Sequence, residues 1–201
     1  MKKIRVGILC GGKSAEHEVS LQSAKNIIDA IDRDKYEVIL IGIDKQGQWF
    51  LGDSAQFLLN ADNPKLIALN KTNELLSFIP GENALVNISN QGSTGPVDVV
   101  FPVMHGPYGE DGTMQGLLKL ANIPFVGAGV LGSAVGMDKD VMKRLLQAAG
   151  IPIARYRAFH RVRRHLIDFE EIEDTLGLPC FIKPANMGSS VGISKVGDRE
   201  E

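Results

Sequence analysis

Three separated segments of the chain carry residues whose types and spacing could do chemistry. Residues 11–20 read GGKSAEHEVS and place Glu16 at the expected start of a helix, where a carboxylate is stabilised and is a good partner for a cation. Residues 105–116 read HGPYGEDGTMQG, and residues 188–192 read GSSVG. A small-residue loop of the last kind can point backbone N–H groups at phosphate oxygens. Without a ligand, Glu16 would be a surface glutamate and the GSSVG loop a plain hairpin turn.

Two lysines could add positive charge for a phosphate ligand. Lys183 follows an apolar run, so its ammonium group would project at the end of a strand. Lys139 lies in the first turn of an expected helix, which is an unfavourable place for a cation given the helix dipole, and a ligand anion could explain it. As isolated residues, both would be solvated surface charges. The functional alternative is that two compact cations converge on one phosphate chain.

Residues 7–14, GILCGGKS, also fit the phosphate-loop pattern G-x-x-x-x-G-K-[ST], which taken alone predicts an NTPase. That pattern requires its first glycine to close a strand, whereas Gly7 lies inside an apolar run, so residues 8–10 would be exposed in the phosphate cradle. A tight strand-to-helix turn at residues 11–12 is the simpler interpretation, because glycine is the usual residue for such turns. A dinucleotide site is not indicated, since no G-x-G-x-x-G follows a strand.

The elements that must position these residues indicate a parallel sheet with crossover helices. Residues 4–10, 38–43 and 97–101 are continuous apolar runs, which implies burial on both faces of the sheet. After the first run, residues 24, 27, 28 and 31 are apolar at helical spacing. His105 follows the third run, at the carboxyl edge where open parallel sheets present ligand-binding residues. Without a ligand, His105 would be satisfied by the following turn, which we expect Glu110 and Asp111 to brace.

The rest of the chain divides into an irregular stretch and a second set of elements. Residues 44–95 are polar and weakly periodic, which predicts irregular structure with short strands. We expect a helix over residues 114–121 and a strand over 124–127 that enters a glycine-rich domain boundary. Asp138 is expected to cap a helix that ends at Gly150. The apolar segments before and after the GSSVG loop, residues 181–184 and 193–196, then predict a hairpin.

Composition limits the functional classes. With 201 residues, 44% hydrophobic and 23% charged, the chain is typical of a soluble globular protein, and its net charge of −2 favours neither nucleic acid nor an anionic membrane. The arginine-rich residues 155–164 are followed at once by acidic residues 168–174, so we expect a compensating surface. The basic and apolar start lacks a signal-peptide cleavage pattern. Cys10 and Cys180 lie in apolar runs, which favours reduced thiols and a cytoplasmic location.

Together, the three segments resemble the D-alanine:D-alanine ligases, in the same order from residue 4 to residue 196. Met137-Asp138-Lys139 and Gly150-Ile151-Pro152 lie between them, and residues 105–116 match a signature of that family. The resemblance implies an ATP-grasp enzyme with an α/β fold: an amino-terminal parallel-sheet (pre-ATP-grasp) domain at residues 1–127, then an incomplete ATP-grasp central domain at residues 128–201. It further implies ATP-dependent ligation of two D-alanines through an acyl phosphate, for peptidoglycan synthesis and thereby cell wall biogenesis and cell shape.

The same resemblance implies roles for individual residues. Glu16 would bind the ammonium group of the first D-alanine, and His105 would lie near that substrate. Ser189 would join a hydrogen-bond network with Glu16 and the substrate, so Glu16 and Ser189 are the expected catalytic residues, with Ser190 as a further substrate contact. The expected ATP-binding residues are Lys139, Lys183, Gly188, Ser189 and Ser190.

The resemblance also sets expectations for the metal, the partners and the activity of residues 1–201. Mg²⁺ or Mn²⁺ is the implied cofactor, with its ligands and a transition-state arginine expected beyond residue 201 and none within this chain. We therefore expect the isolated chain to be inactive, and the whole protein to be a homodimer that uses D-alanine and ATP. A catalytically dead binding fragment and a phosphate-loop NTPase are the competing hypotheses. The second substrate, D-alanine or D-lactate, is left open.

Overall fold

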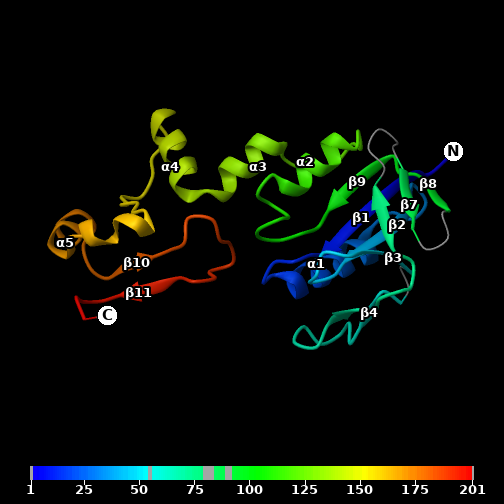
Figure 1. Ribbon diagram of the computed structural model, residues 1–201, viewed down its shortest axis with the longest axis horizontal. Coiled ribbons are helices and arrows are strands. Elements are labelled where there is room, and N and C mark those ends of the chain that lie inside the picture. The colour runs from blue at the N-terminus through cyan, green and yellow to red at the C-terminus, as the bar shows by residue number, and fades with distance from the viewer. Residues whose placement is uncertain (1, 54–55, 79–83, 89–91, 201) are drawn as a thin grey trace. The chain divides into compact units, whose positions relative to one another are not determined.

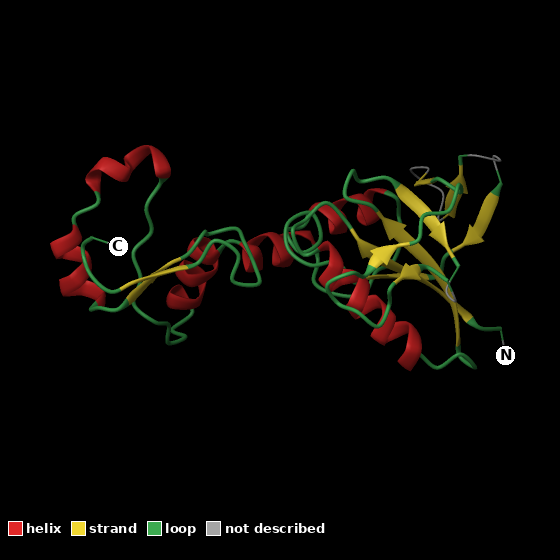
Figure 2. Cartoon of the chain, turned by 90° about the horizontal axis from the view of Figure 1, so that it is seen from below, coloured by secondary structure: helices red, strands yellow, loops and turns green. Residues whose placement is uncertain are grey.

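The computed structural model describes residues 2–53, 56–78, 84–88 and 92–200 (Figure 1). The chain forms two compact regions, Met1–Ala134 and Val135–Glu201. Strands dominate the first region (Figure 2). Among the described residues, no helix has the length and apolar character needed to cross a membrane.

A four-stranded sheet is the centre of the first region. Its strands are β1 (Ile4–Gly11), β2 (Tyr36–Ile43), β3 (Trp49–Gly52) and β9 (Val99–Pro102). They lie in the order β3-β2-β1-β9, with β1 parallel to both β2 and β9 and β3 antiparallel to β2. The predicted parallel sheet is therefore confirmed. In its register, Gly11 pairs with Ile43 and Leu9 with Pro102, so β1, β2 and β9 end at the same edge.

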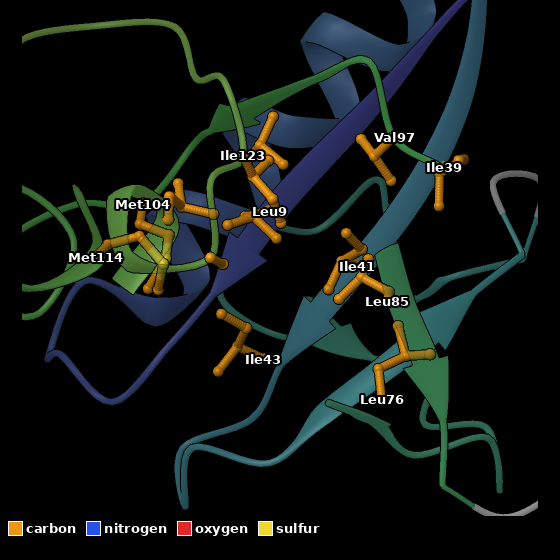
Figure 3. Close-up of a cluster of buried hydrophobic side chains, with 13 residues drawn as sticks. Leu9, Ile39, Ile41, Ile43, Leu76, Leu85, Val97, Met104, Met114 and Ile123 are labelled. Atoms are coloured by element: carbon orange, nitrogen blue, oxygen red, sulfur yellow. The ribbon is translucent and has the colours of Figure 1, made fainter. Parts of the chain in front are cut away.

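Both faces of this sheet are buried, as the continuous apolar runs predicted. Helix α1 (His17–Ala30) covers one face, where Ile8 and Cys10 lie in a cluster with Leu21, Ala24 and Ile28 of the helix. Leu9 points to the other face, where it joins Ile41, Met114 and Leu118 (Figure 3). This alternation of neighbouring residues between two cores follows from the two-residue period of a strand.

Short strands fill the stretch between β3 and β9, as predicted. They are β4 (Leu58–Leu59), β5 (Ala68–Leu69), β6 (Leu76–Phe78), β7 (Ala84–Asn87) and β8 (Ser93–Pro96). β4 pairs with β5, and β6, β7 and β8 form a small antiparallel sheet. From that sheet, Leu76 and Leu85 enter the core beside Ile41 (Figure 3).

The predicted strand at residues 124–127 is wrong. Phe125 makes only an isolated parallel bridge with Val100, supported by bonds from Val100 N to Pro124 O (2.8 Å) and from Val126 N to Val100 O (2.9 Å). The pairing ends because Pro102, two residues after Val100, has no backbone N–H to donate to Val126 O, and because Gly127, with φ of +119°, turns the chain away. The helix predicted before this segment is confirmed as α2 (Thr113–Leu120), and α3 (Val130–Met137) follows it.

The second region has the elements expected around its loop. Asp138 caps α4 (Lys139–Ala148), and Gly150, with φ of +72°, follows the end of that helix. Strands β10 (Cys180–Ile182) and β11 (Ser194–Val196) pair antiparallel, which confirms the predicted hairpin. Between α4 and the hairpin lie a 3-10 helix, η1 (Arg161–Leu166), and α5 (Phe169–Leu176).

Candidate functional site

The end of β1 excludes the phosphate-loop alternative. Gly7 lies in the middle of the strand, paired with Ile39 and Val100, and Ile8, Leu9 and Cys10 are fully buried at 0% exposure. A phosphate cradle needs these residues in an exposed loop. The glycine turn begins only at Gly11, so the match of residues 7–14 to the phosphate-loop pattern is fortuitous.

Two glycines let the chain turn sharply from β1 toward α1. Gly11 and Gly12 have φ of +87° and +99°, a region that disfavours residues with a Cβ. A Cβ on Gly11 would overlap the carbonyl oxygen of Ile43, and Gly12 N donates to that same oxygen at 2.7 Å. The turn is therefore fixed to the end of β2.

Buried polar residues of α1 tie this turn to the segment after β9. Gly11 N donates to Ser20 Oγ at 2.8 Å, and Ser20 Oγ donates to the carbonyl oxygen of Val103. His17 Nδ1 lies 2.8 Å from Gly12 O. Ser20 is 0% exposed and His17 5%. One helix thus holds the carboxyl ends of two neighbouring strands together.

Glu16 and His105, which the sequence analysis singled out separately, are brought together here. Glu16 lies just before α1 and is buried, at 6% exposure. Ser14 Oγ accepts a hydrogen bond from Glu16 N at 3.1 Å and donates one to His105 O at 2.7 Å. Glu16 Oε2 lies so close to Gly106 that a Cβ on that residue would overlap it. A buried carboxylate therefore faces the backbone that follows His105.

The side chain of His105 also contacts α1. Its Nε2 lies 3.0 Å from Ser23 Oγ. Ser14, Ser20 and Ser23 were not among the site residues predicted from the sequence. A signal for Ser20 was present, because it lies four residues before Ala24 and so extends the apolar face of the helix toward its N-terminus. A polar residue on a buried face needs a hydrogen-bond partner.

The turn after His105 is braced by its own carboxylates, as predicted. Gly106 N donates to Glu110 Oε2 at 2.7 Å, and Tyr108 N and Thr113 N donate to Asp111 at 2.9 and 3.0 Å. Burial raises the pKa of Asp111, but the hydrogen bonds from Thr113 and Tyr108 outweigh it and hold the pKa below its usual range. Glu110 and Asp111 therefore stabilise the backbone conformation of this loop.

Two charged neighbours of Glu16 point elsewhere. Glu18 forms an ion pair with Lys45 at 2.6 Å, and the hydrogen bond from Lys45 lowers the pKa of Glu18. The ammonium group of Lys13 lies over the ring of Tyr108, 5.6 Å from its centroid. Glu16 is thus the buried acid of this segment, and Glu18 is a partly exposed one in a surface pair.

In the second region, Lys139 finds its partners within the chain. Its ammonium group donates to the carbonyl oxygens of Pro184 (3.3 Å), Ala185 (3.4 Å) and Met187, and its backbone N–H donates to Ala185 O at 3.0 Å. These carbonyl groups offset the unfavourable position of a cation at a helix start, so no ligand anion is needed to explain it. Lys139 fixes the segment that leads into the GSSVG loop.

The helix cap reinforces this connection. Asp138 accepts hydrogen bonds from the backbone of Val141 and Asp140, and its second oxygen accepts one from Asn186 at 3.0 Å. The bond from Val141 is the main cause of the lowered pKa of Asp138, and the bond from Asn186 contributes further. A carboxylate and an ammonium group at the start of α4 thus both hold residues 184–187.

The loop that follows has an unusual backbone. Ser189 and Ser190 have φ of +45° and +61°, and both are exposed. Consecutive non-glycine residues in this region are unfavourable, by about 1–3 kcal/mol each, and such outliers concentrate at ligand-binding loops. The loop closes through Val191 N donating to Gly188 O at 3.0 Å. Small exposed residues with a strained backbone fit a loop that covers a phosphate group.

Lys183 stands apart from these contacts. Its ammonium group lies over the ring of Phe181, 5.8 Å from the centroid, and its side chain is exposed. The convergence of Lys139 and Lys183 on one phosphate chain therefore stays a prediction. Within the described ranges, no group of three or more His, Cys, Asp or Glu side chains is arranged to hold a metal ion, so no metal is assigned to them.

The arginine-rich stretch is partly compensated by acids, as expected. Arg157 forms an ion pair with Glu171 of α5. His160 and His165 flank or belong to η1 and, like the other described residues, take part in no candidate metal cluster.

Comparison with known proteins gives matches along the chain. Residues 5–128 match a family model described as D-ala D-ala ligase N-terminus, and residues 145–201 match one described as D-ala D-ala ligase C-terminus. The chain is 61% identical over 197 residues to the D-alanine--D-alanine ligase of Shouchella clausii, which covers 97% of this chain and 54% of that protein. It is 57% identical over 203 residues to D-alanine--D-alanine ligase A of Escherichia coli K12, covering 100% of this chain and 56% of that protein.

A solved structure has the same fold. The VanG D-Ala:D-Ser ligase from Enterococcus faecalis superposes with a TM-score of 0.81 at 36% sequence identity, covering 99% of this chain and 57% of that chain. The mixed α/β fold with a parallel amino-terminal sheet is thus that of the ATP-grasp ligases. The chain spans about half the length of the curated relatives that it matches.

Proposed function

Since the chain belongs to the D-Ala–D-Ala ligase family, we propose that it binds D-alanine and part of ATP in an enzyme that joins two D-alanine molecules. Its relatives named D-alanine--D-alanine ligase are 61% and 57% identical, which supports the same substrate class. The product, D-alanyl-D-alanine, would serve peptidoglycan synthesis in the cytoplasm.

The observation that carries this proposal is the position of Glu16. Its carboxylate is buried against Gly106 and is joined through Ser14 to the backbone of His105. A buried carboxylate is stabilised by a cationic partner, and the ammonium group of an amino acid is such a partner. Glu16 would therefore hold the ammonium group of the first D-alanine, with His105 beside it.

The second region would hold the phosphates of ATP. Support comes from the strained backbone at Ser189 and Ser190 and from the way Lys139 fixes residues 184–187. In this proposal the loop covers the transferred phosphoryl group and excludes water, while Lys139 and Lys183 reduce its negative charge. Ser189 would also join the network of Glu16 and the substrate.

The chemistry would proceed in two steps. The carboxylate of the first D-alanine attacks the γ-phosphorus of ATP, and ADP leaves, which gives an acyl phosphate. The amine of the second D-alanine then attacks the acyl carbon; phosphate leaves and the new amide nitrogen loses a proton. Residues of this chain orient the first substrate and shield the acyl phosphate from water. A bound Mg²⁺ or Mn²⁺ would neutralise phosphate charge, through ligands that we expect outside residues 1–201.

The test is phosphate release by the complete protein with ATP and Mg²⁺, measured with and without D-alanine. Glu16→Gln is compared with Glu18→Gln, a matched control in which the same change is made to a surface glutamate paired with Lys45. Loss of a charge-assisted bond to the substrate should lower the D-alanine-dependent kcat/KM about 100-fold in Glu16→Gln only.

Lys13→Ala separates this function from an NTPase. The ligase proposal expects nearly full activity, since Lys13 lies over Tyr108. Hydrolysis of ATP that needs no D-alanine and disappears in Lys13→Ala would favour a phosphate-loop enzyme, and equal losses in Glu16→Gln and Glu18→Gln would remove the assigned role of Glu16.

The second substrate is proposed to be D-alanine, as the names of the curated relatives support. The similarity to a D-Ala:D-Ser ligase makes D-serine the alternative to compare, beside D-lactate. Supplying each of the three with limiting D-alanine and separating the products by mass would decide among them.

We further propose that residues 1–201 alone turn over little or no ATP, and that the complete protein is a homodimer. The share of the relatives that the chain covers, 54% to 56%, supports the first statement. D-alanine-dependent ADP release by the purified 201-residue chain would disprove it, and sedimentation equilibrium of the complete protein tests the second.

A further inference from the structure

The ring of His105 is held by a serine that has no part in the proposed steps. Ser23 Oγ, on α1, lies 3.0 Å from His105 Nε2, although the two residues are 82 positions apart in the sequence. Ser23 is partly buried and belongs to the same helix that Glu16 precedes. The ring orientation of His105 therefore depends on the position of α1.

The backbone of His105 is held from the same direction by a second serine. Ser14 Oγ donates to His105 O at 2.7 Å and accepts the N–H of Glu16 at 3.1 Å. Ser14 is 8% exposed. A single hydroxyl group thus joins the backbone of Glu16 to that of His105, 91 positions from Ser14 along the chain.

We propose that Ser14 and Ser23 are positioning residues of the D-alanine site, an inference that rests on the proposed function. Ser14 sets the separation of Glu16 from the segment that contains His105. Ser23 fixes the orientation of the His105 ring, because its hydroxyl group forms a hydrogen bond with Nε2 in that orientation of the ring. Small errors in the placement of such groups can cost up to about 100-fold in rate.

Ser20 provides a contrast within the same helix. It joins two backbone groups, Gly11 N and Val103 O, and is 0% exposed, so its loss would disturb the turn itself. Ser23 instead contacts a side chain and is only partly buried. Its hydroxyl group can be removed with little effect on the core, which makes Ser23 the cleaner residue to test.

The kinetic test uses Ser23→Ala, Ser23→Thr and Lys25→Ala in the complete protein. Lys25 lies on the same helix in a surface pair with Asp29 at 2.9 Å, so its variant controls for changes in α1. Ser23→Ala should lower kcat/KM for D-alanine about tenfold and leave KM for ATP unchanged. Ser23→Thr, which keeps the hydroxyl group, should restore most of the activity, and Lys25→Ala should retain all of it.

A spectroscopic test reads the hydrogen bond without relying on activity. The ring ¹⁵N signals of His105 are assigned by their loss in His105→Gln and compared between the unsubstituted protein and the Ser23 variants. Ser23→Ala should move them and Ser23→Thr restore them, while the signals of His160 and His165 stay in place. Unmoved ring signals in Ser23→Ala, or an unchanged kcat/KM, would overturn the proposal.

Failure of the proposed function would give a different pattern. An unsubstituted complete protein without D-alanine-dependent turnover would contradict the ligase assignment, whatever the ring signals do. A ligase that is active, with kcat/KM insensitive to Ser23→Ala, would contradict the positioning role alone. Ser14→Ala provides a second comparison, with the same expected loss for D-alanine and an unchanged KM for ATP.

Discussion

The carboxylate of Glu16 lies directly against the backbone of Gly106. Gly106 has φ of +71°, and a Cβ placed on it would overlap Glu16 Oε2 and lie 3.5 Å from the Cβ of Ser14. The absence of a side chain at this position therefore determines how closely the acid before α1 approaches the segment after β9.

Gly106→Ala should damage the site more than the fold. The left-handed backbone costs an alanine about 1–2 kcal/mol, and the added methyl group displaces Glu16. We expect a loss of about 100-fold in D-alanine-dependent kcat/KM, measured by phosphate release. Gly116→Ala is the matched control: nothing lies within 4 Å of its added Cβ, and alanine is the better helix former, so stability should rise by about 0.5–1 kcal/mol. Equal activity in both variants would contradict the assigned contact.

The two cysteines should differ strongly in reactivity. Burial in the core raises the pKa of Cys10 to about 12, and the thiolate is the form that reacts. At neutral pH a thiol reagent should label Cys180, which is partly exposed, and leave Cys10 unmodified until the chain is unfolded. Mass spectrometry of the labelled protein checks this, with Cys180→Ser as the control; rapid labelling of that variant under native conditions would contradict the burial of Cys10.

The cap of α4 should fail in acid. Because the folded-state pKa of Asp138 lies below its ordinary value of 3.8, its contribution is complete above that value and is lost as the pH falls through the folded-state pKa. Amide exchange at Asp140 and Val141 should then accelerate relative to the middle of α4. Asp138→Asn keeps an acceptor that does not titrate and should remove this pH dependence, whereas Asp138→Ala should weaken the helix start by about 1 kcal/mol at neutral pH. An identical pH profile in Asp138→Asn would assign the effect to another group.

Lys139→Met should loosen the segment that leads into the GSSVG loop. It removes the ammonium donor shared by Pro184, Ala185 and Met187, so deuterium uptake in residues 184–193 should increase, and ATP should bind the complete protein about tenfold more weakly. Lys143→Met is the control, because it removes the same charge from the same helix, where the ammonium group lies over Tyr156. It should change neither the deuterium uptake nor the affinity for ATP. If Lys139→Met weakened ATP binding but left the deuterium uptake of residues 184–193 unchanged, Lys139 would act through its charge alone.

Much of the first region could be predicted from sequence because its signals are local. Continuous apolar runs gave β1, β2 and β9, and paired glycines gave the turn after β1. The strand predicted at residues 124–127 was wrong for a non-local reason. Its residues are apolar, but Pro102 of the partner strand β9 has no N–H to continue the pairing, so only one bridge forms.

The site could be predicted only in part. Glu16 and His105 were identifiable from their segments, and the structure brings those segments together. The serines that join them were not, because serine is common on helix surfaces and nothing local distinguishes Ser23 from an exposed residue. For Lys139, charge at a helix start indicated an unusual cation, but its carbonyl partners lie more than 40 positions away and could not be read from the sequence.

The hydrogen bonds that Ser14 and Ser23 form with His105 also set a point in biosynthesis before which the site cannot exist. Ser14 and Ser23 leave the ribosome with the first strand and helix, whereas their partner is translated 91 and 82 codons later. A nascent chain that has not yet delivered β9 has Glu16 and the glycine turn but lacks the segment around His105 that lies against Glu16, and contacts so distant in sequence form late. Capture of D-alanine by stalled nascent chains of increasing length would therefore report the moment at which the first region closes.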